Sequence, residues 1–187
     1  MSLICVIDSP SLRIYLLKYY TGIGSKDTPQ AELARMEKIG SFLGDLGYVL
    51  RTGDAVGAER AFEQGALNTK ALVQKWRSDT SYFPLPEWAT EKASEVCWEK
   101  PLERMKAFQI SRVTQRVFQV FGDSVDIQHP VDFVVYWSLS DPLSPLTDSE
   151  GDLRYTVRVA HKAGIPTYNL RSQREAFAHL LLSLKDS

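Results

Sequence analysis

The chain has 187 residues, of which 44% are hydrophobic and 24% charged, a composition typical of one globular domain with a sizeable core. Its formal net charge of -1 argues against a large nucleic-acid-binding surface, which normally carries a basic excess. No hydrophobic run approaches the ~20 residues of a membrane span, and the N-terminus shows no secretory signal. Cys5 and Cys97 lie far apart without metal-ligand spacing. We therefore expect a cytoplasmic protein with reduced thiols, no metal and no membrane partner.

The expected elements alternate between strands and helices along the chain. Strands are predicted at 3–7, 13–20, 48–50, 71–73, 131–137 and 166–170, and helices at 29–46, 57–66, 87–94, 101–121, 153–163 and 172–184. Thr28 and Ser172 are the expected N-caps, and Gly47, Gly122 and Gly164 end their helices. This alternation predicts an α/β fold: a single Rossmann-like domain over residues 1–187, with a mainly parallel sheet flanked by helices.

Two segments stand out from this alternation. The strand 131–137 is almost continuously hydrophobic, which is typical of a parallel strand covered on both faces. The segment from about 76 to 100 is rich in aromatic residues and proline, and is too hydrophobic for a solvated linker. We expect it to form a lid or an insertion.

A first glycine run follows the strand 13–20. Gly22, Ile23, Gly24, Ser25 and Lys26 lie between this strand and the next helix, where an open α/β sheet binds phosphate groups. Glycine lets the backbone approach an anion closely. These residues are candidate ligand contacts, and the alternative is a tight turn without a ligand.

A second glycine run occupies the same place after the strand 48–50. Its candidate ligand contacts are Gly53, Asp54, Ala55, Gly57 and Ala58. Two such junctions on consecutive strands suggest one nucleotide-sized ligand held between two strand ends.

Two carboxylates follow on the next helix. Glu59 and Glu63 lie four residues apart, so they share one helix face. Beside a sugar they are candidates for an acid, base or nucleophile at the anomeric carbon. The alternative is a pair of surface acids in helical ion pairs.

A third junction precedes the helix 153–163. Gly151, Asp152 and Arg154 open this helix after the most hydrophobic strand, at a further strand end. An acid here favours the positive end of the helix dipole but repels phosphate. Both ligand binding and simple helix capping remain open for this junction.

The two glycine runs together resemble the SLOG superfamily of Rossmann-like domains, which includes the DNA-processing protein A and the "lonely guy" phosphoribohydrolases. The resemblance covers most of the chain and is nearest to small stand-alone members found in bacteriophage and bacterial genomes. The matching stretches are 21–29, 52–66, 130–137 and 160–170. It implies a nucleotide pocket at the carboxyl ends of the strands and self-association into a homo-oligomer.

The chain departs from the family pattern at several positions. Asp54 replaces a usual glycine, Glu59 replaces a usual aspartate, and Asp152 enters a loop that is normally glycine-rich. The phosphoribohydrolase signature is absent. Where the family often has a His-x-Arg-Asn run, this helix offers Arg112 or Arg116 as substitutes.

Three functions follow as hypotheses. The first is binding of a nucleotide or a nucleotide-derived signalling molecule of the ADP-ribose type, as a sensor or sequestering protein in phage–host conflict. The second is hydrolysis of an N-glycosidic bond in a nucleotide, with Glu63 or Glu59 in the catalytic role. The third is a single-stranded DNA-binding module, which the near-neutral charge disfavours. Apart from a nucleotide ligand, no cofactor is expected.

Overall fold

The computed structural model describes residues 17–76, 85–98, 100–123, 129–144 and 151–186, so the strand expected at 3–7 lies outside the described residues. Its strands are β1 (Lys18–Gly24), β2 (Tyr48–Thr52), β3 (Val73–Lys75), β4 (Phe133–Trp137) and β5 (Thr167–Asn169). Its helices are α1 (Gln30–Asp45), α2 (Ala58–Asn68), α3 (Glu87–Ser94), the 3₁₀ turn η2 (Leu102–Arg104), α4 (Ala107–Phe121), α5 (Leu153–Lys162) and α6 (Arg174–Lys185). None of the helices described is both long and apolar enough to cross a lipid bilayer.

The five strands form one parallel sheet in the order β3-β2-β1-β4-β5. The predicted α/β, Rossmann-like fold is therefore confirmed. The strand order reverses between β1 and β4, where Thr21 pairs with Val134 and Gly24 with Trp137. In open parallel sheets, ligands bind beyond the carboxyl ends of the strands, near such a reversal.

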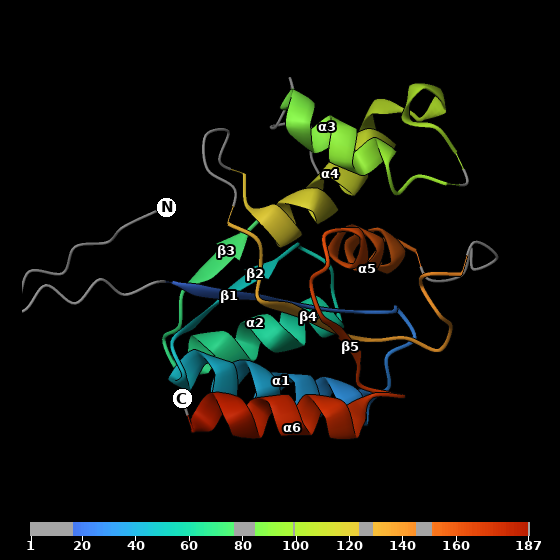
Figure 1. The fold of residues 1–187 in the computed structure, drawn as a ribbon. Coiled ribbons are helices and arrows are strands. Elements are labelled where there is room, and N and C mark those ends of the chain that lie inside the picture. Colours follow the sequence, from blue (N-terminus) through green and yellow to red (C-terminus); the bar gives the residue numbers. More distant parts are fainter. Residues whose placement is uncertain (1–16, 77–84, 99, 124–128, 145–150, 187) are drawn as a thin grey trace, which may run out of the picture.

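Helices cover both faces of the sheet. Figure 1 shows α1, α2 and α6 on one face, and α3, α4 and α5 on the other. Alternate residues of β1 serve the two faces, because successive side chains of a strand point in opposite directions. Tyr20 joins the core beneath α1 and α2, whereas Tyr19 and Ile23 join the core beneath α4 and α5.

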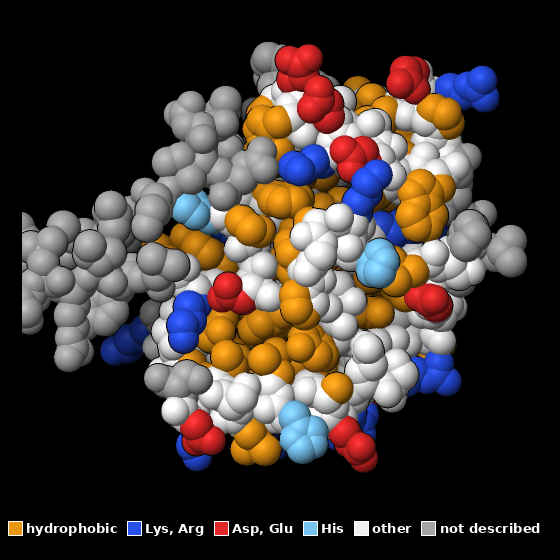
Figure 2. Space-filling model, in the orientation of Figure 1, with side chains coloured by type: hydrophobic (Ala, Val, Ile, Leu, Met, Phe, Trp, Pro, Cys, Tyr) orange, Lys and Arg blue, Asp and Glu red, His pale blue; other side chains and the backbone are white. Residues whose placement is uncertain are grey.

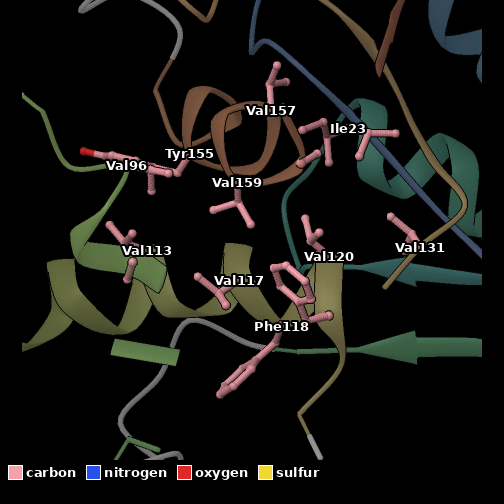
Figure 3. Packing of buried hydrophobic residues seen from close by; sticks show 14 of the residues in the cluster. Ile23, Val96, Val113, Val117, Phe118, Val120, Val131, Tyr155, Val157 and Val159 are labelled. Atoms are coloured by element: carbon pink, nitrogen blue, oxygen red, sulfur yellow. The ribbon is translucent and has the colours of Figure 1, made fainter. Parts of the chain in front are cut away.

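Valine is the commonest residue in the described core on the α4 side. Val113 and Val117 of α4 face Tyr155 and Val159 of α5 (Figure 3). These side chains are all buried. This packing fixes the two helices relative to each other, and the first turns of both helices matter for the site described below.

Arg158 ties the aromatic-rich segment to this core. It lies on α5 and is 1% exposed. Its guanidinium donates hydrogen bonds to the carbonyls of Pro142 (3.0 Å), Ser144 (3.1 Å) and Val96 (3.4 Å), and it lies 4.2 Å from the ring centroid of Trp98. Arg158 thus helps to hold the described part of the 76–100 segment against α5, together with the Lys162–Glu95 ion pair.

A second buried arginine lies within the sheet. Arg51 of β2 stacks on the ring of Tyr19 at 3.9 Å and donates from Nε to Gln74 at 2.8 Å. Its Nη1 donates to the carbonyls of Val120 and His129. Burial is the largest influence on this guanidinium and lowers its pKa to about 10. Arg51 therefore joins β2 to the end of α4 and to the chain that enters β4.

Two predicted helix caps are wrong. The hydroxyl of Thr28 donates to the Ser25 carbonyl at 2.6 Å, and the N-cap of α1 is Pro29. The N-cap of α6 is Gln173, whose side chain accepts the Asn169 N–H at 2.9 Å. At the start of α1, a local turn takes the Thr28 hydroxyl that was expected to cap the helix.

The helix expected at 101–121 is broken near its start. η2 is followed by Met105 in an extended conformation (φ -87°, ψ 151°), and α4 begins only at Ala107. Gln109 accepts the backbone N–H of Lys106 at 3.0 Å, which supports the new helix start. The break brings Met105 to the wall of the cavity described below.

The surface in Figure 2 mixes charged and hydrophobic side chains. Hydrophobic side chains gather over the region between the sheet and α6, with charged groups around them. Tyr168 of β5 and Leu180, Leu181 and Leu184 of α6 are partly buried there against the core. Self-association of the chain stays a prediction.

Candidate functional site

The first glycine run is used for packing between β1 and α2. A Cβ built on Gly22 would lie 2.4 Å from the ring of Phe62, and one on Gly24 would lie 2.5 Å from the Cβ of Ala58. Separations this short do not occur between real atoms, so both positions need glycine for the close approach of α2. Packing explains these two glycines without a ligand.

The polar end of this run is also occupied. Ser25 is buried, and its N–H donates to the Trp137 carbonyl at 3.0 Å, which extends the β1–β4 ladder by one residue. Its hydroxyl accepts the Asp27 N–H at 3.3 Å. Ile23 belongs to the core, and Lys26 is exposed. Of the candidate contacts in this run, Lys26 is the side chain that faces solvent.

The second glycine run folds around a carboxylate from its own helix. Glu59 is 5% exposed, and its Oε2 accepts the backbone N–H of Ala55 at 3.0 Å. Its Oε1 forms an ion pair with Nη1 of Arg116 on α4. An N–H that a phosphate would use in a ligand-binding loop is therefore taken by an internal anion. Gly57 precedes α2 with φ 89° and ψ -120°, a conformation that favours glycine.

Gly53 makes room for this polar centre. A Cβ on Gly53 would lie within 3 Å of Glu59 Oε2 (2.5 Å), Gln115 Nε2 (2.8 Å) and Gln119 Nε2 (2.9 Å). Gln119 also accepts from Arg116 at 3.0 Å and from the Thr156 hydroxyl at 3.3 Å. Gly53, Ala55 and Glu59 are thus brought together with α4 at the carboxyl edge of the sheet.

Asp54 and Glu63 are placed elsewhere, around Lys75. The ammonium of Lys75 lies 3.1 Å from Asp54 and 3.0 Å from Glu63. Burial alone would lower the pKa of Lys75, but hydrogen bonds and charge from Glu63 and Asp54 outweigh it and raise the pKa. Glu63 also pairs with Arg60 at 3.2 Å. The two carboxylates predicted for catalysis therefore have separate cationic partners: Glu59 pairs with Arg116, whereas Glu63 pairs with Lys75 and Arg60.

The third junction opens into a cavity. A hollow of about 300 Å³ lies between η2, the first turns of α4 and the first turn of α5. Gly151, Asp152 and Arg154 of the predicted site line it, whereas the first two glycine runs contribute none of its described lining. Its volume is at the lower end of the range for ligand pockets.

The lining combines cations with aromatic rings. In the described lining, Lys100, Arg112 and Arg154 supply three positive charges against the one carboxylate of Asp152, while Phe108 and Tyr155 supply rings. The guanidinium of Arg154 lies 5.0 Å from the Tyr155 ring centroid and donates to its hydroxyl at 3.1 Å. In a chain of net charge -1, this is a local concentration of positive charge.

Helix geometry adds to the positive character of this cavity. α5 follows β4, so it begins at the carboxyl edge of the sheet. The end of α4 pairs with the chain that enters β4, because the Val131 N–H donates to the Val120 carbonyl at 2.8 Å. α4 therefore begins at the same edge as α5. The positive ends of two helix dipoles face the cavity, which favours an anionic ligand.

Asp152 connects this cavity to the second glycine run. Its Oδ2 accepts from Arg112 Nε at 2.7 Å and lies 3.7 Å from Arg116 Nη2. Arg116 in turn holds Glu59, which holds the Ala55 N–H. Arg112 and Arg116, expected as substitutes for a family residue, thus lie on either side of Asp152.

A second hollow of about 590 Å³ lies beyond the ends of β4 and β5. Its polar groups are largely satisfied within the chain: the Asn169 side chain donates to the Ser138 carbonyl at 3.2 Å and accepts the Ser138 N–H at 3.3 Å. Arg171 is the one Lys or Arg in its described lining, and Asp141 opposes it. It offers less to an anion than the first cavity.

The sequence prediction missed six residues of the described lining, namely Lys100, Met105, Phe108, Gln109, Val113 and Tyr155. They carry no motif, and Tyr155 lies far along the chain from the others. Phe108 fits the hydrophobic pattern of the helix expected at 101–121, and only the structure shows that it is half exposed. No group of three or more His, Cys, Asp or Glu side chains suited to a metal occurs among the described residues.

Comparisons with known proteins give no further assignment. No family model matches the chain, and no curated protein or solved structure shows significant similarity to it.

Proposed function

We propose that this chain binds a nucleotide or a nucleotide-derived signalling molecule in the cavity between the first turns of α4 and α5. The observation that carries the proposal is the lining, in which Lys100, Arg112 and Arg154 accompany the rings of Phe108 and Tyr155. Guanidinium groups suit phosphate, and aromatic faces suit a nucleobase. The carboxyl edge of a parallel sheet is the usual place for such a ligand.

Binding without turnover is favoured over hydrolysis of an N-glycosidic bond. Glu59 is bound to Arg116 and the Ala55 N–H, and Glu63 is bound to Lys75 and Arg60. Neither carboxylate is part of the described cavity lining. A sensor or a sequestering protein therefore fits the arrangement better than a glycosidase.

The test is a thermal-shift screen followed by calorimetric titration. The probes are the nucleoside mono-, di- and triphosphates, ADP-ribose and its cyclic derivatives. We expect at least one of them to stabilise the protein, and Arg154→Gln to weaken its binding at least tenfold. Incubation of the bound ligand with the protein should release no free base. A folded protein that none of the probes stabilises would overturn the proposal.

A second variant tests which of the two cavities holds the ligand. Arg171→Gln removes the Lys or Arg side chain from the described lining of the second hollow and leaves the first hollow intact. Weaker binding in Arg171→Gln and unchanged binding in Arg154→Gln would move the ligand to the ends of β4 and β5.

A further inference from the structure

Asp152 is the one carboxylate in the described lining of the cavity, and arginines fix its orientation. Both Nε and Nη2 of Arg112 approach Oδ2, at 2.7 Å and 2.5 Å, and Arg116 Nη2 lies 3.7 Å from the same atom. Within the described residues, the hydrogen bonds and ion pairs of the Asp152 side chain all end on Oδ2. The side chain lines the cavity and is 17% exposed, and its second oxygen, Oδ1, takes part in none of these contacts.

A carboxylate in this position selects the group placed against it. It repels a phosphate at short range, so phosphate is directed to Lys100 or Arg154, the described cations of the lining that form no ion pair with Asp152. It accepts hydrogen bonds strongly and donates none when ionised. The partner it selects is therefore a hydroxyl or amine donor of the ligand.

The sugar of a ribonucleotide supplies such donors between its phosphate and its base. The vicinal 2′- and 3′-hydroxyls of ribose present two O–H groups, whereas a 2′-deoxyribose presents one. With phosphate beside Arg154 and a base against Phe108 or Tyr155, the sugar is the part of the ligand that remains for Asp152.

We propose that Asp152 is a specificity-determining residue that selects ribonucleotides over 2′-deoxyribonucleotides, an inference that rests on the proposed nucleotide function. Its Oδ1 accepts a hydrogen bond from the ribose 2′-hydroxyl, while Arg112 holds the carboxylate in place through Oδ2. A site that binds a hydroxyl with a charged acceptor loses affinity when the hydroxyl is missing. Because Asp152 is partly exposed, we expect a loss of roughly tenfold to a hundredfold.

The experiment titrates the purified chain with the four ribonucleoside 5′-monophosphates and their four 2′-deoxy counterparts, each by calorimetry. Wild-type protein should prefer the ribose form of every base that it binds, by about tenfold or more. This comparison needs no variant, so a folding defect cannot obscure it. Equal affinity for ribose and deoxyribose forms would overturn the role of Asp152 and leave the proposed function standing. If none of the eight nucleotides binds, this inference fails, whereas the proposed function fails only if the wider thermal-shift screen also finds no ligand.

The Asp152→Asn variant then assigns the preference to this residue. The amide keeps the size of the side chain and removes the charged acceptor, so the ribose preference should shrink to about threefold or less. Asp45→Asn, at the end of α1 and at the opposite edge of the sheet, is the matched control and should keep the wild-type preference. A full ribose preference in folded Asp152→Asn would overturn the assignment.

Discussion

Glu59 at the start of α2 and Arg116 in α4 form a buried ion pair that joins the two helical layers across the carboxyl edge of the sheet. The side chain of Glu59 is 5% exposed and that of Arg116 is 7% exposed. Solvent therefore screens the pair little, and the charge of Glu59 depends on Arg116 for compensation.

The variant Glu59→Gln should be strongly destabilised. It leaves the buried Arg116 guanidinium with the more distant carboxylate of Asp152, at 3.7 Å, and weakens the hold on the Ala55 N–H, at a cost of about 3 kcal/mol in the free energy of unfolding. Urea denaturation followed by circular dichroism measures this loss. Arg60→Gln, which removes an exposed ion pair on the same helix, should change stability by less than ~0.5 kcal/mol. Equal effects in the two variants would contradict a special role for the buried pair.

Gly22 should prove to be a packing residue. Gly22→Ala forces the ring of Phe62 out of position and should cost about 1–3 kcal/mol, measured by thermal and urea unfolding. In a Phe62→Ala background the same change should cost almost nothing, because the clashing ring is gone. If instead Gly22→Ala keeps full stability and abolishes ligand binding, the glycine run contacts the ligand after all.

Stability should fall on mild acidification because of His129. Burial, and then the cation of Arg51, lower the pKa of this imidazole in the folded state. In the unfolded chain the imidazole takes up a proton near its ordinary pKa of about 6.5. As the pH falls through that value, protonation favours the unfolded state, so this contribution to stability is lost from about pH 7 downward.

The measurement is the urea midpoint between pH 5 and pH 8. His129→Gln should flatten the profile relative to wild type, whereas His161→Gln, at an exposed position, should leave it unchanged. A wild-type urea midpoint that rises as the pH is lowered would contradict the expected loss of stability.

Arg158 should resist replacement even by lysine. A single ammonium cannot reach the three carbonyls of Val96, Pro142 and Ser144, so Arg158→Lys leaves buried acceptors unsatisfied and should cost about 2 kcal/mol or more. Lys162→Gln removes a neighbouring exposed ion pair with Glu95 and should be nearly silent in the same unfolding assay.

The sequence predicted the fold better than the site. Each described helix follows a 3.6-residue pattern, and the hydrophobic run at 131–137 gave β4 within two residues of its observed start. Such patterns depend on neighbouring residues alone. Because strands and helices alternate along the chain, few sheet topologies are possible. The break at Met105 was missed because hydrophobic periodicity continues across it.

Most residues of the candidate site could not be predicted from the sequence, because their contacts join distant parts of the chain. Gly22 and Gly24 have the spacing of a ligand loop, yet the atoms they accommodate belong to Phe62 and Ala58, and no sequence distance shows that contact. Glu59 and Glu63 share a helix but belong to different charge clusters, because Arg116 and Lys75 approach from other elements. Only Gly151, Asp152 and Arg154 of the expected contacts line the cavity.

Arg154 and Arg158 lie one turn apart on α5, and this spacing has a practical use. The first arginine lines the cavity, and the second lies over the indole of Trp98. A ligand that displaces the first turn of α5 also displaces Arg158, because both belong to the same rigid helix. Trp98 is half exposed, so its emission responds to the water and charge around it. An intrinsic optical signal of occupancy, free of any added label, is therefore best sought at Trp98.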